Sequence, residues 1–203
     1  MISSRLIKSN NAAAGCVDIV DAYDPFAGNG VALYQLNGNA NDVSGNYNGT
    51  ATSVTYGAGV FGQAGVFNGS SSSFQAANGI SSQGTDLTFS LWYKTNNISA
   101  TQILVDFNFS AGNGIQLYNT TIGSAGTLVY RAIIPTDNVI FQIIQTSAIT
   151  SNNVWNNVVI TYENKTNGLA KIYVNGNFLS TATSTQTGVA TFGSGNQYLG
   201  SRN

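Results

Sequence analysis

The sequence contains no histidine and one cysteine among its 203 residues. A Ser-His-Asp triad, a Cys-His pair and a histidine metal cluster are therefore excluded. Cys16, being alone, cannot form an intrachain disulfide, and a cysteine-rich zinc site is excluded as well. We interpret Cys16 as a bystander, with pairing between two chains as the alternative.

Charged residues are also scarce. They make up 7% of the chain, whereas about a quarter is typical of soluble proteins. Seven Lys and Arg residues oppose eight Asp and Glu residues, so no basic field exists that would attract nucleic acid. No apolar run approaches the roughly 18 residues of a membrane helix. We therefore expect neither nucleic acid nor a membrane as a partner.

Short stretches of alternating apolar and polar residues fill most of the chain after residue 30, and no segment has a helical period. Gly, Asn and Ser residues separate these stretches, which is typical of a β-sandwich or barrel. The length fits one domain. We predict an all-β fold whose first strands are Val31–Leu36, Ala64–Phe67, Ser73–Ala77, Leu87–Thr95, Gln102–Phe109 and Gly114–Asn119.

The clearest strand signal runs from Val154 to Thr181. Side chains alternate over 157–162 and again over 170–174, with a polar loop between. Asn175 and Gly176 then supply the two residues with positive φ that a type I′ hairpin turn needs. A strand, a loop, a strand, a turn and a third strand are therefore expected in this segment.

This segment, VWNNVVITYENKTNGLAKIYVNGNFLST, resembles the central hairpins of laminin-G-like domains of the concanavalin-A-like jelly-roll superfamily. Three further blocks resemble the family in its order: LYQLNGNANDVSGNYNGT from Leu33, FGQAGVFNGSSSSF from Phe61 and LTFSLWYK from Leu87. The resemblance implies an antiparallel jelly-roll β-sandwich over residues 31–203.

It also implies one more strand after Gln197–Gly200, returning beside the entry strand, yet the sequence ends at Asn203. Either the sequence is a fragment that lacks its final strand, or residues 1–30 or another subunit supply the edge, because an open edge invites pairing.

Residues 1–30 are expected to form an N-terminal arm, because only weak strand signals precede the breaker cluster Gly28–Gly30. The leader Ser3–Lys8 and its small-residue spacer resemble the start of virion proteins of tailed marine bacteriophages. The resemblance implies a fibre, tail or capsid-decoration protein whose arm docks onto other virion proteins. The polar residues Ser9–Asn11 interrupt any signal-peptide core, so we expect synthesis in the host cytoplasm. An extracellular adhesin is the weaker alternative.

The segment Leu128–Thr146 suggests a subunit interface. Pro135 fits a turn between two strands, and the second strand is apolar on both faces through Val139, Phe141 and Ile143 on one side and Ile140 and Ile144 on the other. Such a strand normally has both faces covered. Either a loop or the arm folds over it, or a second copy does; we predict a homo-oligomer.

Catalysis is not expected. Glycosidases of the superfamily use two carboxylates at close spacing, but Glu163 is the only glutamate and has no acidic partner nearby in the sequence. Asp18, Asp21 and Asp24 are clustered within the predicted arm, where we interpret them as a solvated acidic stretch. The sequence therefore predicts a protein that is not an enzyme.

A metal site is conceivable in the loop that follows the first predicted strand. Asp42, Asn39 and Asn41 offer the hard oxygen atoms that Ca²⁺ takes, and Ser44 and Asn46 offer more. The resemblance implies calcium as well, since many laminin-G-like domains bind it near a rim loop. The alternative is that these side chains close Asx-turns by accepting hydrogen bonds from their own backbone.

Sugar binding needs an exposed aromatic ring beside polar groups. Tyr47, in the same loop, and Tyr118 with Asn119, at a strand end, fit that description. Trp92 and Trp155 are assigned to the core. We predict a non-enzymatic recognition module that binds glycans on a host surface; the alternative is a structural capsid, tail or fibre protein with no ligand.

Overall fold

The computed structural model describes residues 2–3, 31–76, 86–110, 113–121, 124–134, 138–145, 151–185, 187 and 197–200. Side chains are described in these ranges except at 2–3, 108–110, 113–114, 131–134 and 138–145. Apart from Ile2 and Ser3, the predicted arm, with Cys16 and its aspartates, lies outside the described residues. All secondary-structure elements within these ranges are β-strands, which confirms the predicted all-β class. None of the described segments is a helix that could cross a membrane.

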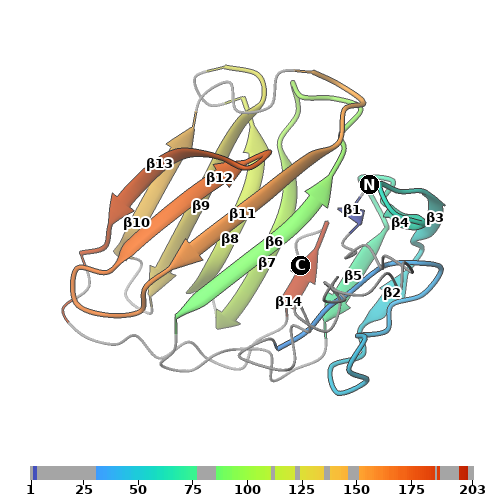
Figure 1. Ribbon diagram of the computed structural model, residues 1–203, viewed down its shortest axis with the longest axis horizontal. Coiled ribbons are helices and arrows are strands. Elements are labelled where there is room, and N and C mark those ends of the chain that lie inside the picture. Colours follow the sequence, from blue (N-terminus) through green and yellow to red (C-terminus); the bar gives the residue numbers. More distant parts are fainter. Residues whose placement is uncertain are drawn as a thin grey trace, which may run out of the picture.

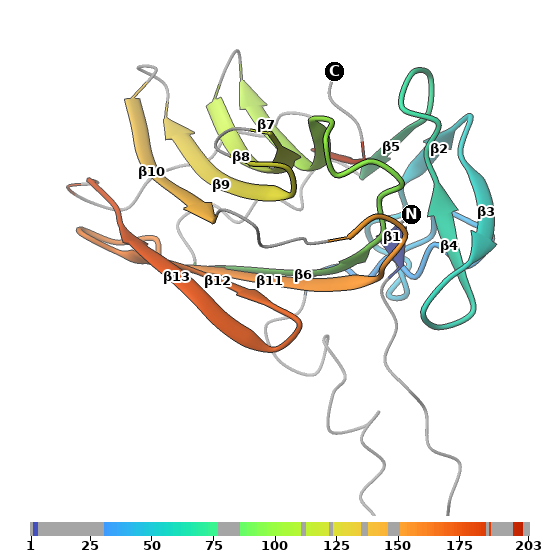
Figure 2. The same cartoon turned by 90° about the horizontal axis from the view of Figure 1, so that it is seen from above.

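The strands form two antiparallel sheets that pack face to face (Figures 1 and 2). This arrangement is the predicted jelly-roll sandwich. Sheet 1 has the order β13 (Asn177–Thr183), β12 (Leu169–Val174), β11 (Asn156–Tyr162), β6 (Leu87–Tyr93), β1 (Ile2–Ser3), β4 (Gln63–Val66) and β3 (Thr55–Ala58). Sheet 2 has the order β10 (Asn138–Gln145), β9 (Thr127–Ile134), β8 (Asn113–Thr120), β7 (Gln102–Ser110), β14 (Gln197–Leu199), β5 (Ser73–Ala76) and β2 (Thr50–Thr52).

The core lies between the sheets and follows from the period of two in each strand. In β11, Val158, Ile160 and Tyr162 are buried while the residues between them are half-exposed. β8 contributes Ile115 and Leu117 from the opposite sheet. Each such side chain contributes about 1.5–3 kcal/mol on burial, so the facing rows of β11 and β8 stabilise the contact between layers.

The predicted hairpins are confirmed. β11 pairs with β12, and β12 pairs with β13, along their lengths. Between the last two strands Asn175 and Gly176 have φ values of 51° and 80°, as a type I′ turn requires.

The strand predicted at Val31–Leu36 is wrong. This stretch makes only an isolated bridge, between Tyr34 and Asp42. The reason is local: Leu33 donates its N–H to the Asp42 side chain instead of to a neighbouring strand, and Leu36 has a φ of 51°, which breaks the extended conformation.

Two short strands sit inside the sheets rather than at their edges. β1 pairs with β4 through Ile2 and Gly65, and with β6 through Ile2 opposite Tyr93 and Ser3 opposite Trp92. β14 lies between β7 and β5. The extreme N-terminal residues therefore contribute a strand to sheet 1.

The segment around Pro135 is described only in part. β9 and β10 pair as expected, whereas residues 135–137 lie outside the described ranges. β10 is one of the two edge strands described in sheet 2 and lies close to β13 and β12 of the other layer. Since the side chains of β10 are not described, the predicted subunit interface stays a prediction.

Candidate binding site

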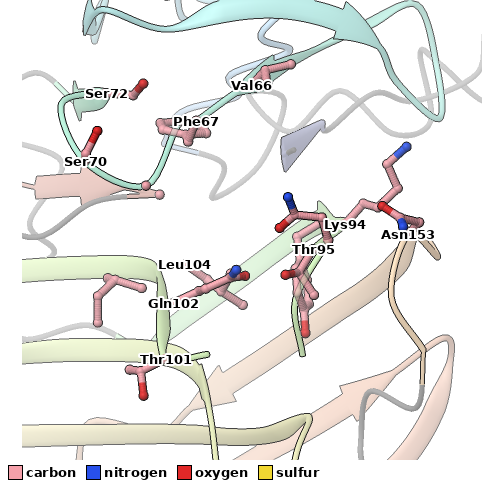
Figure 3. A pocket seen from close by; sticks show the side chains of 15 residues that line it. Val66, Phe67, Ser70, Ser72, Lys94, Thr95, Thr101, Gln102, Leu104 and Asn153 are labelled. Carbon is pink, nitrogen blue, oxygen red and sulfur yellow. The ribbon is translucent and has the colours of Figure 1, made fainter. Parts of the chain in front are cut away.

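A cavity of about 380 Å³ lies at one end of the sandwich (Figure 3). Its walls come from the two connections that cross from one sheet to the other, residues 67–72 between β4 and β5 and residues 94–101 between β6 and β7, with strand ends beside them. The described lining residues are Val66, Phe67, Gly69, Ser70, Ser72, Tyr93, Lys94, Thr95, Asn96, Thr101, Gln102, Ile103, Leu104, Asn153 and Gly200.

An Asx-turn shapes the wall formed by residues 67–72. The side-chain oxygen of Asn68 accepts the backbone N–H groups of Ser70, Ser71 and Ser72 at 2.9, 2.9 and 3.0 Å. The Ser72 hydroxyl donates to the Ser53 carbonyl at 2.8 Å, which ties the turn to the connection between β2 and β3. The turn therefore fixes two serines of the cavity wall without help from a ligand.

The opposite wall, residues 94–101, is held from two sides. Asn153 donates its N–H to the Thr95 carbonyl at 2.7 Å, and Ile98 donates to the Asn152 side chain, also at 2.7 Å. On the other side the Asn119 amide donates to the Ala100 carbonyl at 3.0 Å. These bonds make a rigid wall out of a connection that has no strand partner of its own.

Gly200 closes the cavity beside Phe67. Its φ is +67°, and a Cβ atom there would lie 2.8 Å from atoms of the Phe67 ring. Gly200 also donates its N–H to the Leu104 carbonyl at 3.0 Å. Only glycine allows this backbone to turn and the aromatic ring to approach so closely.

The cavity carries one charge and one unusual hydroxyl. Lys94 is the only charged residue among the described lining residues, and its Nζ lies 5.2 Å from the centroid of the Trp155 ring. Tyr93 is 1% exposed, and its hydroxyl has no hydrogen-bond partner among the described residues. Burial raises the pKa of Tyr93 well above its ordinary value, so the hydroxyl keeps its proton. Such a hydroxyl would gain a hydrogen bond from any ligand atom that reached it, since native structures rarely leave a buried donor unsatisfied.

The predicted sugar-binding residues are not brought together. Asn119 is fully buried and supports the cavity wall through Ala100. Its neighbour Tyr118 is half-buried and points to the other face of sheet 2, since side chains alternate along β8. Tyr47 lies just before β2, four strand positions from β8, or roughly 19 Å at the usual strand spacing.

The predicted calcium residues lie in a loop that bonds to itself. Asp42 is 3% exposed, and its carboxylate accepts the N–H groups of Leu33 (2.7 Å) and Tyr47 (3.3 Å) and the Ser44 hydroxyl. This geometry matches the Asx-turn alternative and uses both carboxylate oxygens.

The asparagines beside Asp42 behave similarly. Asn39 accepts the N–H of Asn41 at 2.9 Å, and both residues are exposed. Among the described residues no group of three or more His, Cys, Asp or Glu side chains could hold a metal. Calcium at Asp42 stays a prediction.

The assignment of both tryptophans to the core is wrong. In β6 the residues on either side of Trp92, Leu91 and Tyr93, are buried, so alternation turns Trp92 outward, where it packs edge to face on Phe61 at 6.4 Å. Trp155 is half-buried beneath the Lys94 side chain. Each ring borders the surface instead of filling the interior.

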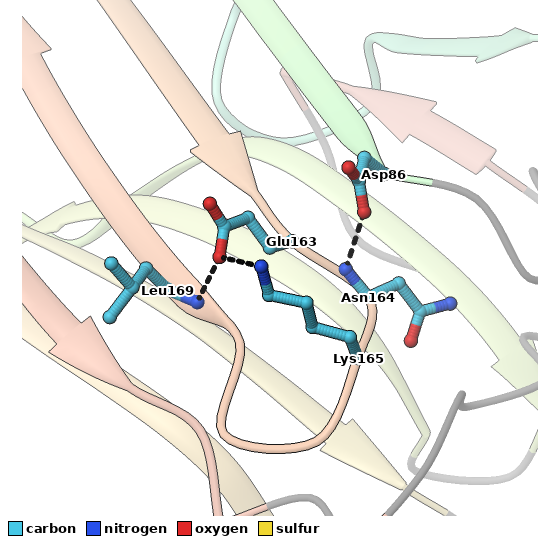
Figure 4. A network of polar contacts seen from close by, with 5 residues as sticks. All are labelled: Asp86, Glu163, Asn164, Lys165 and Leu169. Carbon is cyan, nitrogen blue, oxygen red and sulfur yellow. Dashed lines mark hydrogen bonds and ion pairs between the residues drawn. The ribbon is translucent and has the colours of Figure 1, made fainter.

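Glu163 has an acidic neighbour that is distant in sequence (Figure 4). Asp86, just before β6, accepts the Asn164 N–H at 2.9 Å. Glu163 itself pairs with Lys165 at 3.1 Å and accepts the Leu169 N–H at 3.2 Å. Both carboxylates thus close the loop between β11 and β12, away from the cavity.

These features define an antiparallel jelly-roll domain with a partly polar rim cavity. The chain belongs to the concanavalin A-like lectin/glucanases superfamily, because the model of its Laminin_G_3 family matches residues 67–203. No curated protein matches the sequence.

Several solved structures have the same fold. The binding domain of Paraclostridial Mosquitocidal Protein 1 is 21% identical, with a TM-score of 0.60 over 78% of this chain and 41% of that one. The receptor binding domain of the botulinum neurotoxin C/D mosaic serotype is 15% identical, with a TM-score of 0.59 over 78% and 40%. The botulinum neurotoxin serotype G binding domain is 14% identical, with a TM-score of 0.57 over 78% and 40%. This chain spans about two fifths of each.

Sequence reasoning missed the cavity because its walls meet only in three dimensions. Tyr93 and Lys94 belong to the LTFSLWYK block and Ser70 and Ser72 to the FNGSSSSF block, both of which served only to identify the fold. The one available signal was the run of serines after Asn68, which is typical of an Asx-turn.

Proposed function

We propose that this chain is a recognition domain that binds glycans in the rim cavity. The observation that carries the proposal is the mixed polar and apolar lining of that cavity, which includes Tyr93, whose buried hydroxyl has no partner among the described residues. Around it lie hydroxyl and amide groups and the apolar side chains of Phe67 and Leu104, a combination that suits the polar edges and apolar faces of a sugar.

The proposed domain is not catalytic. Glycoside hydrolysis requires two carboxylic acid side chains flanking the scissile bond, and no Asp or Glu is among the described lining residues. The carboxylates of Asp86 and Glu163 lie away from the cavity and accept the backbone N–H groups of Asn164 and Leu169 in the loop between β11 and β12. Binding without turnover is the function that this lining supports.

Calorimetry with glycans selected on an array tests the proposal. We expect Tyr93→Phe to weaken binding by about tenfold, the worth of one hydrogen bond in a desolvated site. Tyr173→Phe is the matched control, since Tyr173 lies on β12 and packs on Phe178, outside the cavity. Equal losses in both variants, or no glycan bound by folded protein, would refute a rim site.

We further propose that the domain acts on the surface of a virion, where it recognises a host. Support comes from the leader resemblance described above and from the names of three proteins of similar fold, all binding domains of other proteins. Detection of the chain in purified particles by mass spectrometry, and adsorption of those particles blocked by the isolated domain, are the expected results.

A structural role without a ligand is favoured by one observation. Tyr173 and Phe178 pack together at 5.6 Å on the outer face of sheet 1, and Phe178 is 55% exposed. Phe178, exposed beside the half-buried Tyr173, adds apolar surface of the kind that marks protein contacts where it extends into a patch. Self-association that Phe178→Ser abolishes, with no glycan bound by wild type, would favour this second function.

A further inference from the structure

Two long strands end the sheets on the same flank of the sandwich (Figure 1). In the part of the chain that the structure describes, β13 is an edge strand of sheet 1 and β10 an edge strand of sheet 2, and the two lie close together. β13 has seven residues and β10 has eight, whereas the strands that end the sheets on the other flank, β3 and β2, have four and three. Because a short edge strand offers few groups for pairing, most of the described open edge lies on the flank of β13 and β10.

Neither long edge strand is blocked by its sequence. An edge strand exposes N–H and C=O groups that a further strand can bind, and proteins commonly prevent this with charged residues or proline. β13 has the sequence NFLSTAT and β10 the sequence NVIFQIIQ, with no charged residue and no proline in either. Residues 172–201 as a whole contain neither. No charged side chain of these strands therefore opposes pairing with another strand.

One irregularity interrupts β13. Its pairing with β12 shifts in register at Leu179, which marks a bulge, and a bulge also discourages edge pairing. Over residues 180–183 the pairing is regular, and Thr181 and Thr183 are exposed. Both threonines lie on the outer face of the sheet, because Thr181 stands opposite Lys171, between the buried residues of β12. The edge that can accept a new strand is therefore centred on residues 180–183.

A second copy of the chain fits this edge. Two copies of one strand can pair antiparallel around a twofold axis, because each then supplies the donors and acceptors that the other needs. With the axis at Thr181, threonine meets threonine, which is a favourable pair across strands. Lys171, one strand further in, would lie three strand spacings from its copy, or roughly 14 Å. This distance exceeds the screening length of about 10 Å at 0.1 M salt, so the two lysines would repel each other little.

We propose that two copies of the chain associate through β13, whose residues 180–183 pair antiparallel with their own copy and extend sheet 1 across a twofold axis. Phe178, which is 55% exposed on the same strand, adds apolar surface beside the contact. The inference goes beyond the proposed function, since none of the described cavity-lining residues lies on β13.

Sedimentation velocity over a range of protein concentrations tests the proposal. We expect wild type to pass from monomer to dimer as the concentration rises. Thr181→Lys should raise the dissociation constant of the dimer by about tenfold or more, because two positive charges would meet across the axis.

Two controls separate charge at the edge from other effects. Thr181→Val should dimerise like wild type, since it keeps the branched shape and loses only a hydroxyl that donates to the Ala170 carbonyl at 2.9 Å. Thr88→Lys should also dimerise, because Thr88 is exposed on β6, which is an inner strand of the same sheet. Circular dichroism confirms that each variant is folded.

Hydrogen exchange locates the contact. At a concentration where the dimer dominates, amides of β13 should exchange more slowly than in the monomer, and amides of β6 should not change.

Each other outcome overturns a distinct claim. Wild type that stays monomeric at every concentration would overturn the inference. A dimer that Thr181→Lys leaves intact, or that slows exchange outside β13 alone, would overturn pairing at this edge; if Phe178→Ser abolishes that dimer, the aromatic face forms the contact instead. Loss of the dimer in Thr88→Lys as well would overturn the assignment to β13. Glycan binding is measured separately on Thr181→Lys, and its result bears on the rim cavity alone.

Discussion

Two tyrosine hydroxyl groups of this domain should contribute differently to the free energy of unfolding. The Tyr93 hydroxyl is buried and has no partner in the part of the chain that the structure describes, whereas the Tyr34 hydroxyl donates to the Tyr47 carbonyl at 2.5 Å. We expect Tyr93→Phe to leave the free energy of unfolding unchanged or to raise it by up to about 1–3 kcal/mol, because phenylalanine has no hydroxyl group to bury without a hydrogen bond. Tyr34→Phe should lower it by about 1 kcal/mol. Urea titrations of both variants measure this; a loss of stability for Tyr93→Phe would show that the Tyr93 hydroxyl has a hydrogen-bond partner outside the described residues.

Asp42 is a second residue whose role can be separated from a ligand. Its carboxylate holds the N–H groups of Leu33 and Tyr47, so Asp42→Ala should lower the free energy of unfolding by about 1–3 kcal/mol. Calcium is tested in the same samples by calorimetry. Heat on adding Ca²⁺ to wild type but not to Asp42→Ala would support the metal site, and no heat in either would leave Asp42 with its loop-closing role alone.

The loop between β11 and β12 depends on a glycine that no turn pattern identifies. A Cβ atom on Gly168 would lie 1.9 Å from the Glu163 carbonyl oxygen, so the backbone itself must move. At Gly176 the only obstacle is a φ of +80°, with nothing within 4 Å. We expect Gly176→Ala to cost about 1 kcal/mol and Gly168→Ala at least twice that, by thermal or urea unfolding. Equal costs would show that the loop shifts freely.

The same loop should respond to acid. Hydrogen bonds from Lys165 and Leu169 lower the pKa of Glu163 below its ordinary value of 4.5. A carboxyl group with a lowered folded-state pKa contributes stability above about pH 4.5, and this is lost as pH falls through the folded value. Glu163→Gln should therefore be less stable than wild type at pH 7 and converge with it in strong acid. A constant difference across pH would contradict this.

An element could be predicted from the sequence where the residues that determine it lie close together along the chain. The hairpins of β11, β12 and β13 were predictable because alternation and Asn175-Gly176 act within a few residues. The outward orientation of the Trp92 side chain was not predictable, since it depends on which face of β6 packs against the second sheet. The prediction of a strand at Val31–Leu36 was wrong for a similar reason. The carboxylate of Asp42, nine residues further along the chain, accepts the Leu33 N–H that a neighbouring strand would have bound.

At the scale of the whole molecule, the cavity and the layers have a common origin. Both connections in the cavity walls exist because the chain passes from one sheet to the other, from β4 to β5 and from β6 to β7. The jelly-roll order therefore creates the rim, and the side chains on the connections decide what it binds. The family resemblance could predict the order of the strands and hence the rim, but not the side chains that line the cavity, because loops vary more than strands do.

Sheet 1 offers the last test, because β1 alone joins its two halves among the described strands. On one side lie β6, β11, β12 and β13, and on the other β4 and β3, with Ile2 opposite both Gly65 and Tyr93. Each ladder hydrogen bond contributes about 0.5–1.5 kcal/mol, so removing residues 1–8 should weaken the join locally. Hydrogen exchange should then quicken at amides near Gly65 and Tyr93 and stay unchanged between β8 and β9, which pair with each other in the other sheet. Unchanged exchange around Gly65 would mean that β4 and β6 are protected without β1. Faster exchange in β8 as well would mean that β1 supports the whole sandwich, because the loss of a local strand should not otherwise reach the second layer.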